Sequence, residues 1–378
     1  LSFAQTDMAF SGDVLVTGNY HGFNVYRLTD AKAPTLLSSV VCPGGQGDVS
    51  IVGNLLIMSV EQTLGRVDCG RQGVKDEVSP ERFRGRPVID RGRVFVGHQK
   101  RFAALDLATG KLVWSFAAES IWAPIYSVPA VAGDIGVVAL GRGDKSVVAF
   151  DPSNGRQVWT LSVPASTRIQ ASPVMSKDRV YIGNVEVILA AHEISRGARA
   201  WATPSLYPTH EWAYWSLGTP ALAHDTLFVP TPRTYLHALD AHNGAPRWKA
   251  AAGEAVVNPV PYKTKASGFL AAPVVTGGYV WAGGIDGILR CLDVGSGEEV
   301  WTLDLGSPIL MGAVPSGRYL FVATYDGTVQ ALRGELFTET LLPPSRFRMK
   351  TTIFAGVSVL VVASLLVYFV VRRRAKRS

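Results

Sequence analysis

The chain has 378 residues, only 18% of them charged, with 38 glycines and 22 prolines. Its formal net charge of +7 arises at one end, because residues 345–378 hold eight of the 37 basic residues and no acid, which leaves 29 basic and 30 acidic residues in 1–344. A nearly neutral main part lacks the basic surface that nucleic-acid binding requires, so we expect no nucleic-acid partner.

Residues 1–70 contain short apolar runs separated by glycines and other turn residues. This stretch resembles the bacterial LVIVD-repeat propellers as far as Asp68-Cys69-Gly70, where the match stops. We expect it to form two blades of a larger propeller, because two blades cannot close a core alone. The chain begins at Leu1 without a methionine, which leads us to expect that a targeting segment has been removed or that the numbering starts after one. Cys42 and Cys69 flank the second expected blade, and an oxidising compartment would allow a disulfide between them.

One phrase recurs between residues 105 and 301: an acid, a glycine four residues later and a tryptophan eight residues later. The acids lie 42 to 53 residues apart, a period typical of β-propellers. The acid and the glycine predict a hairpin turn, and the tryptophan predicts an anchor in the wedge between neighbouring sheets. The copies are Asp106-Gly110-Trp114, Asp151-Gly155-Trp159, Glu193-Gly197-Trp201, Asp240-Gly244-Trp248 and Asp293-Gly297-Trp301.

A second phrase, a proline near small or branched apolar residues, predicts the innermost strands of the blades after residue 85, since a proline is tolerated at the first residue of a strand. Counted together with the apolar runs of residues 1–70, innermost strands start near residues 8, 49, 88, 130, 174, 221, 274 and 314. They predict an all-β, eight-bladed propeller of four-stranded blades over residues 1–344. Seven blades remain the alternative if the irregular stretch 60–86 forms none, and the wide interval from 220 to 273 predicts an insertion around 252–269.

These phrases resemble the pyrroloquinoline-quinone-like (PQQ-like) propeller repeat over about residues 85–335. We therefore assign residues 71–344 to quinoprotein-like blades that continue from the LVIVD-like blades of 1–70. The resemblance implies two kinds of function. Proteins of this repeat class include outer-membrane assembly lipoproteins with no catalysis, and quinone-dependent dehydrogenases that use adjacent cysteines, a stacking tryptophan, a calcium site and a catalytic aspartate.

The sequence contains no recognisable catalytic, cofactor or metal motif. None of its three cysteines are adjacent, and neither a His-x-x-x-His nor a Cys-x-x-Cys pair occurs. The acids show no calcium-ligand spacing, and their fixed offset to glycine is that of turn formers. We therefore expect no cofactor, no metal and no enzymatic activity, and we expect Cys291 to be a buried free thiol.

Two connections that precede innermost strands contain more aromatic residues than a blade connection requires: residues 121–126 and 207–215. Both should lie on one face near the channel mouth, and loops on such faces commonly carry function. Aromatic residues are enriched at interaction hot spots. We predict a partner-binding rim; the alternative is that the same side chains fold inward and plug the channel. The rim consists of Trp122, Tyr126, Tyr207, His210, Trp212, Tyr214 and Trp215.

Residues 351–371 form an apolar segment without a charge. As a helix it would be about 31 Å long, enough to cross a hydrocarbon core of about 30 Å. The positive-inside bias places the tail 372–378 in the cytoplasm and the propeller on the periplasmic or extracellular side. Basic residues flank the segment, in the tether 345–350 and in the tail, and are expected near lipid headgroups: Arg346, Arg348, Lys350, Arg372, Arg373 and Arg374.

Together these features predict a single-pass membrane protein whose propeller is a non-catalytic scaffold or an accessory subunit of a membrane protein complex. The bacterial character of both repeats and the absence of an Asn-x-Ser/Thr sequon favour a bacterial inner (plasma) membrane. One alternative is a sensor of surface ligands or carbohydrates, whose signal would pass through a partner because seven residues follow the apolar segment. The other is a quinone-dependent oxidoreductase.

Overall fold

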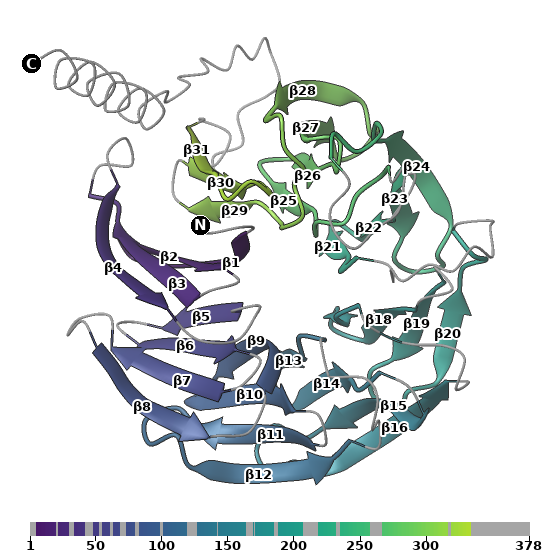
Figure 1. Ribbon diagram of the computed structural model, residues 1–378. Helices are drawn as coiled ribbons and strands as arrows, with labels where there is room; N and C mark the ends of the chain where they lie inside the picture. Colours follow the sequence, from purple (N-terminus) through teal and green to yellow (C-terminus); the bar gives the residue numbers. More distant parts are fainter. Residues whose placement is uncertain are drawn as a thin grey trace, which may run out of the picture.

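The chain forms eight antiparallel sheets that follow one another around a central axis, as Figure 1 shows for the computed structural model. Strands pair with their sequence neighbours, so each sheet is a meander whose first strand lies nearest the axis. This is the all-β propeller that the repeats predict. The structure describes residues 5–333 except 20–21, 30–33, 42–47, 53–54, 61–62, 69–72, 80–82, 99–100, 119–126, 142, 164–168, 170, 185–187, 207–217, 232–234, 258–266 and 317–318.

The first four sheets comprise sixteen strands. They are β1 (Gln5–Ser11), β2 (Val14–Asn19), β3 (Gly22–Arg27), β4 (Thr35–Val41); β5 (Asp48–Val52), β6 (Leu55–Val60), β7 (Thr63–Asp68), β8 (Gly73–Ser79); β9 (Phe83–Asp90), β10 (Arg93–His98), β11 (Arg101–Asp106), β12 (Leu112–Ala117); β13 (Ala130–Ala132), β14 (Ile135–Ala139), β15 (Gly143–Phe150) and β16 (Gln157–Val163).

The other four sheets comprise fifteen strands. They are β17 (Val174–Met175), β18 (Arg179–Gly183), β19 (Leu189–Glu193), β20 (Arg199–Ala202); β21 (Ala221–Ala223), β22 (Thr226–Pro230), β23 (Tyr235–Asp240), β24 (Pro246–Ala251); β25 (Val274–Thr276), β26 (Tyr279–Gly283), β27 (Ile288–Asp293), β28 (Glu299–Asp304); β29 (Val314–Ser316), β30 (Tyr319–Ala323) and β31 (Val329–Arg333).

The number of sheets matches the eight predicted innermost strands, but the sheets are not all alike. Seven have four strands and the eighth has three. The stretch 60–86, on which the seven-blade alternative depended, supplies β7 and β8 to a complete four-stranded sheet. Four strands are confirmed in seven sheets, and a fourth strand in the eighth stays a prediction, because β31 ends at Arg333 and residues 334–378 lie outside the described part.

The repeated acid and glycine form the predicted hairpin turns. In the fourth sheet, Asp151 Oδ1 accepts the backbone N–H of Ser153 at 2.8 Å, and the N–H of Gly155 donates to the Asp151 carbonyl at 2.8 Å. Gly155 has φ +75°, in the left-handed region that favours glycine. The hydrogen bonds from Ser153 hold the pKa of Asp151 below its ordinary value. The carboxylates of this motif therefore serve the turns.

The repeated tryptophan links each of the third to sixth sheets to the sheet that follows. The rings of Trp114, Trp159, Trp201 and Trp248 lie against the turn glycine of the following sheet, where an added Cβ would come within 2.5–2.8 Å of the indole. Each indole N–H also donates, at 2.7–3.2 Å, to the carbonyl of the residue after the following acid. These acceptors are Pro152, Ile194, Ala241 and Val294. The predicted wedge is confirmed, with a hydrogen bond that the sequence did not indicate.

The hydrophobic core is divided into layers between neighbouring sheets. Phe95, Trp114 and Phe150, for example, belong to one cluster between the third and fourth sheets. The first sheet packs against the eighth, where the ring centroids of Phe10 and Phe321 are 4.6 Å apart. Buried apolar area of this kind is the main source of stability. The ring is therefore closed by ordinary sheet packing, and each sheet depends on its two neighbours.

One innermost strand departs from the expected position of its proline. Pro87 lies inside β9, at a break in the pairing of β9 with β10, rather than at the start of the strand. A register break accommodates a residue without an N–H. Cys291 is buried as predicted, and burial raises the pKa of its thiol to about 12.

Several sequence predictions fall outside the described residues. They are the disulfide between Cys42 and Cys69, the tether 345–350, the apolar segment 351–371 and the tail 372–378. Within the described part of the chain, no helix is long and apolar enough to cross a membrane. These predictions stay predictions.

Candidate functional site

The antiparallel order of the strands gives the disc two faces. The turns between first and second strands, and between third and fourth strands, lie on one face, which we call the turn face. The turns between second and third strands, and the connections between sheets, lie on the opposite face, which we call the connection face. The predicted aromatic rim is expected on the connection face, because its two segments lie in sequence between the last strand of one sheet and the first strand of the next.

The structure does not place the rim side chains. All seven lie outside the described residues: Trp122, Tyr126, Tyr207, His210, Trp212, Tyr214 and Trp215. The ends of both connections are described. The N–H of Val128 donates to Ser172 Oγ at 2.9 Å, and the N–H of Gly218 donates to the Pro230 carbonyl at 3.2 Å. Each connection therefore returns to the ring beside an innermost strand, β13 or β21.

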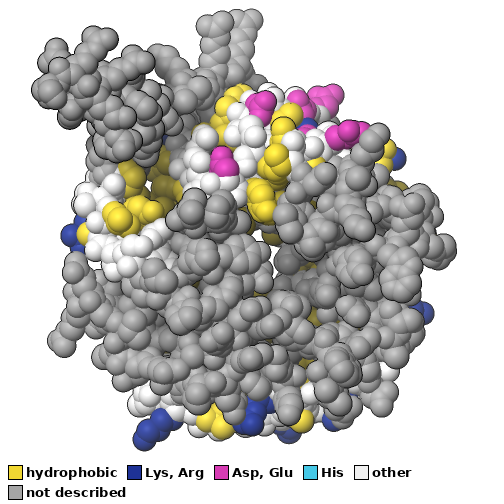
Figure 2. Space-filling model, in the orientation of Figure 1, with side chains coloured by type: hydrophobic (Ala, Val, Ile, Leu, Met, Phe, Trp, Pro, Cys, Tyr) yellow, Lys and Arg dark blue, Asp and Glu magenta, His cyan; other side chains and the backbone are white. Residues whose placement is uncertain are grey.

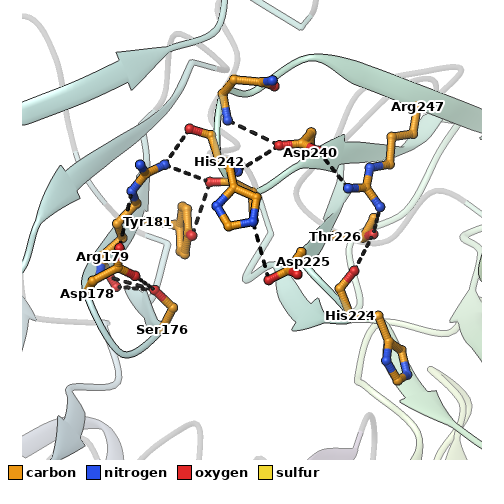
Figure 3. A network of polar contacts seen from close by, with 12 residues as sticks. Ser176, Asp178, Arg179, Tyr181, His224, Asp225, Thr226, Asp240, His242 and Arg247 are labelled. Carbon is orange, nitrogen blue, oxygen red and sulfur yellow. Dashed lines mark hydrogen bonds and ion pairs between the residues drawn. The ribbon is translucent and has the colours of Figure 1, made fainter.

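The turn face carries a polar network between the fifth and sixth sheets (Figure 3). The carbonyl of Ala241 accepts hydrogen bonds from the Arg179 guanidinium, the Tyr181 hydroxyl and the Trp201 indole, each at 3.2 Å. Arg179 also donates to the carbonyl of His242. Arg93 reaches the carbonyls of Pro152 and Ser153 in the same way two sheets earlier. These arginines fasten one sheet to the turn of the next.

The outer part of this network holds polar side chains in pairs. Arg247 donates to Asp240 Oδ2 and to Thr226 Oγ1, both at 2.6 Å. The hydrogen bond from Arg247 to Asp240 is the main reason that the pKa of Asp240 is lowered. His242 Nε2 is 3.6 Å from Asp225 Oδ1. The imidazole of His224 points away from the network (Figure 3). The carboxylates have structural partners, and the arrangement holds turns together rather than aligning a base with a nucleophile.

The connection face contains a buried ion pair in the seventh sheet. Arg290 Nη1 and Nη2 donate to the two carboxylate oxygens of Asp286 at 3.0 and 2.5 Å, and both side chains are less than 9% exposed. Asp286 also accepts the N–H of Gly253 at 2.6 Å and of Ile288 at 3.2 Å. Burial alone would raise the pKa of Asp286, but these donors outweigh it and lower the pKa. The pair fixes the start of the predicted insertion, 252–269, to the sheet that follows it.

A second ion pair links the innermost strands of the first three sheets. Arg86 Nε is 3.0 Å from Asp7 Oδ2, and Arg86 also donates to the carbonyls of Met8 and Val49. Asp7 accepts the N–H groups of Met8 and Val49 at 2.8 and 3.0 Å. Burial raises the pKa of Asp7 in spite of these contacts. This group joins β1, β5 and β9 beside the axis.

His237 lies on β23, where it faces the fifth sheet. Burial, with a smaller contribution from Lys249, lowers its pKa to about 4, so the imidazole is neutral at physiological pH. Its Nε2 atom is buried and has no hydrogen-bond partner among the described residues. Tyr235 lies beside it, with Lys249 Nζ 4.4 Å from the centre of the phenol ring.

The predicted absence of metal and cofactor sites is not tested by the structure. Among the described residues, no three His, Cys, Asp or Glu side chains are grouped as metal ligands. Sequence reasoning missed Asp286, Arg290, Asp7 and Arg86. A sequence signal for Asp286 was available. An Asp-Gly pair occurs between the second and third strands of both the seventh and the eighth sheet, as Asp286-Gly287 and Asp326-Gly327.

Comparison with known proteins agrees with the repeat analysis. A profile of the PQQ-like propeller family described as "Outer membrane protein assembly factor BamB" matches residues 32–250 and 209–308. The outer membrane protein assembly factor BamB of Burkholderia pseudomallei is 27% identical over 241 residues, which cover 59% of this chain and 58% of that protein. The chain thus spans little more than half the length of this relative.

Solved structures show the same fold. BamB from Moraxella catarrhalis superposes with a TM-score of 0.66 at 15% identity, covering 87% of this chain and 94% of that chain. The quinohemoprotein alcohol dehydrogenase of Comamonas testosteroni superposes with a TM-score of 0.68 at 12% identity, covering 85% of this chain and 71% of that chain. At these identities the likeness concerns the fold alone. The family profile matches more than half of the chain, from residue 32 to residue 308, and on its strength the chain belongs to the PQQ-like propeller family of outer membrane protein assembly factor BamB.

Proposed function

We propose that this protein is a non-catalytic propeller scaffold that acts as an accessory subunit of a membrane-protein assembly complex. The observation that carries the proposal is the match of residues 32–308 to the assembly-factor family. The polar contacts of the described sheets support it. Arg179, Arg247 and Arg290 fasten turns and connections to their neighbours, as a rigid docking platform requires.

We propose further that the propeller is held outside the cytoplasm by residues 351–371, as a single-pass segment of the plasma membrane with the tail 372–378 inside. The support is the length of the uncharged segment and the basic residues on both of its sides. The partner complex is then one that the propeller meets at the outer surface of that membrane.

The partner-binding surface that we propose is the aromatic rim on the connection face. Its support is the density of aromatic residues and their place in two connections that lead to innermost strands. A double variant, Trp212→Ala with Trp215→Ala, should reduce recovery of a stoichiometric membrane complex by about tenfold or more in a mild-detergent pull-down, since hot-spot aromatics contribute about 2 kcal/mol or more each.

The matched control is Leu112→Ala with Val113→Ala, which changes two exposed apolar side chains on the outer strand β12. It should leave the recovered complex unchanged. The rim variant should also keep the wild-type melting temperature. A large fall in melting temperature would contradict the rim and support aromatic side chains that plug the channel.

The enzymatic alternative predicts a bound quinone. We expect purified protein to show no quinone absorbance, because the adjacent cysteines of the dehydrogenases have no counterpart among Cys42, Cys69 and Cys291. The measurement is an absorbance spectrum of protein purified from native membranes. A chromophore in stoichiometric amount would overturn the scaffold proposal.

A further inference from the structure

An exposed apolar pair lies on the connection face at the start of the predicted 252–269 insertion. Val256 and Val257 are 53% and 48% exposed. They follow Gly253, whose N–H is held by the buried Asp286 at 2.6 Å. The buried pair of Asp286 and Arg290 thus holds the backbone three residues before the first exposed valine.

Three exposed acids belong to the strand ends and turns linked to this pair by short contacts. Gly287 lies between the valine pair and the turn at Ser307. A Cβ added to Gly287 would lie 3.2 Å from Val256 Cγ2 and 2.9 Å from Ser307 N. Asp304 caps the turn just before Ser307 by accepting the N–H of Gly306 at 2.8 Å. The N–H of Asp326 donates to Ser307 Oγ at 3.1 Å. We call this surface the valine patch: Glu254, Val256, Val257, Asp304 and Asp326.

Basic side chains are few among the described residues near the valine patch; Lys263 and Lys265 belong to the stretch 258–266, outside the described part. Arg290 and Arg333 are the basic residues in the described part of 251–333, and the guanidinium of Arg290 is already paired with Asp286 and lies 3.5 Å from Glu299. Figure 2 shows acidic side chains beside hydrophobic ones over the part of the ring that Figure 1 labels β27 and β28. A complementary partner therefore presents apolar side chains flanked by positive charges.

The chain itself contains such a segment beyond the described residues. Residues 346–350 read Arg-Phe-Arg-Met-Lys, two apolar side chains interleaved with three bases. The twelve residues 334–345 reach up to about 40 Å when extended. The strand β31 ends at Arg333, about 17 Å along the sheet from the turn that holds Asp326. The segment can therefore reach the valine patch.

We propose that residues 346–350 dock on the valine patch, with Phe347 and Met349 against the two valines and the three bases beside Glu254, Asp304 and Asp326. This docking deepens the proposed anchoring. Residues 351–371 follow directly, so the connection face, and with it the aromatic rim, is turned toward the bilayer. Without the bases, the three carboxylates would face an anionic membrane surface and be repelled by it.

A cross-linking experiment on the full-length chain in vesicles tests the docking. The variant Val257→Cys with Met349→Cys should form an internal disulfide about tenfold faster than Leu112→Cys with Met349→Cys, because docking raises the effective concentration of the two thiols. Leu112 is equally exposed but lies on the outer strand of the third sheet. Linked peptides identified by mass spectrometry separate these products from those of the native cysteines.

Two comparisons sharpen the result. Adding Glu254→Lys and Asp304→Lys to the Val257→Cys and Met349→Cys variant should slow disulfide formation about fivefold, because exposed charge pairs are lost. Adding Glu298→Lys, which lies on the turn face, should not change the rate. The link should form equally in vesicles of phosphatidylcholine alone and in vesicles with anionic phosphatidylglycerol. Equal rates for both cysteine pairs, or loss of the link in anionic vesicles, would overturn the docking and assign the bases to the tether or to lipid. Recovery of the membrane complex by the wild-type chain would still stand in that case, so the two proposals fail separately.

Discussion

Replacing Asp286 with alanine is expected to lower the free energy of unfolding by about 3–5 kcal/mol, because it leaves the buried guanidinium of Arg290 without its main partner. Glu299, 3.5 Å away and half exposed, is the remaining acid beside Arg290 and compensates it poorly. The N–H groups of Gly253 and Ile288 lose their acceptor as well. Chemical denaturation of the detergent-solubilised chain measures the change.

The matched control is Asp304→Ala, which removes an exposed carboxylate that also accepts a backbone N–H and should cost about 1 kcal/mol or less. The effect of pH has a definite sign. The pKa of Asp286 is lowered in the folded chain from an ordinary value of 3.8, so its stabilisation is full above that value and is lost as the pH falls through the folded pKa. The gap between wild type and Asp286→Ala should therefore narrow in acid. Equal costs for the two variants at neutral pH would refute a structural role for the pair.

The sequence predicted those parts of the fold whose causes are local. An acid followed four residues later by glycine specifies a turn by its own hydrogen bonds, as at Asp151 and Gly155, and the spacing of such turns specifies a propeller. The strand pattern was sufficient to count eight innermost strands. It was insufficient for Pro87, because a break in strand pairing depends on the neighbouring strand rather than on the residue itself.

The missed contacts are those that the ring creates between distant segments. Arg86 belongs to a charged stretch with a weak strand signal, and its partner Asp7 lies two sheets away. Asp286 lies in the turn before β27, and Arg290 lies in β27 itself. The bend at Gly287 between them brings the two side chains together. The aromatic rim was found by composition alone, which identifies an excess of aromatic side chains but contains no information about their direction.

The strongest test of the interlocked ring is a pair of substitutions at one contact. Trp201→Ala should lower the free energy of unfolding by about 3–5 kcal/mol, since it removes a large side chain from the wedge together with its hydrogen bond to Ala241. Gly244→Ala should also destabilise the chain, because Gly244 has φ +75° and its new Cβ would lie 2.7 Å from Trp201 Cε3. The backbone accounts for about 1–2 kcal/mol of that loss and the clash for about 1–3 kcal/mol.

Combining the two substitutions separates the clash from the backbone cost. With Trp201 already replaced, Gly244→Ala should cost only the backbone part, so the double variant should be more stable than the sum of the single effects predicts by about 1–3 kcal/mol. Gly133→Ala is the matched control, because Gly133 has φ +61° with nothing within 4 Å of an added Cβ. If Gly244→Ala costs no more than Gly133→Ala in the wild-type background, the indole does not press on the turn. The contact between the indole and Gly244 would then not be tight enough to constrain the turn.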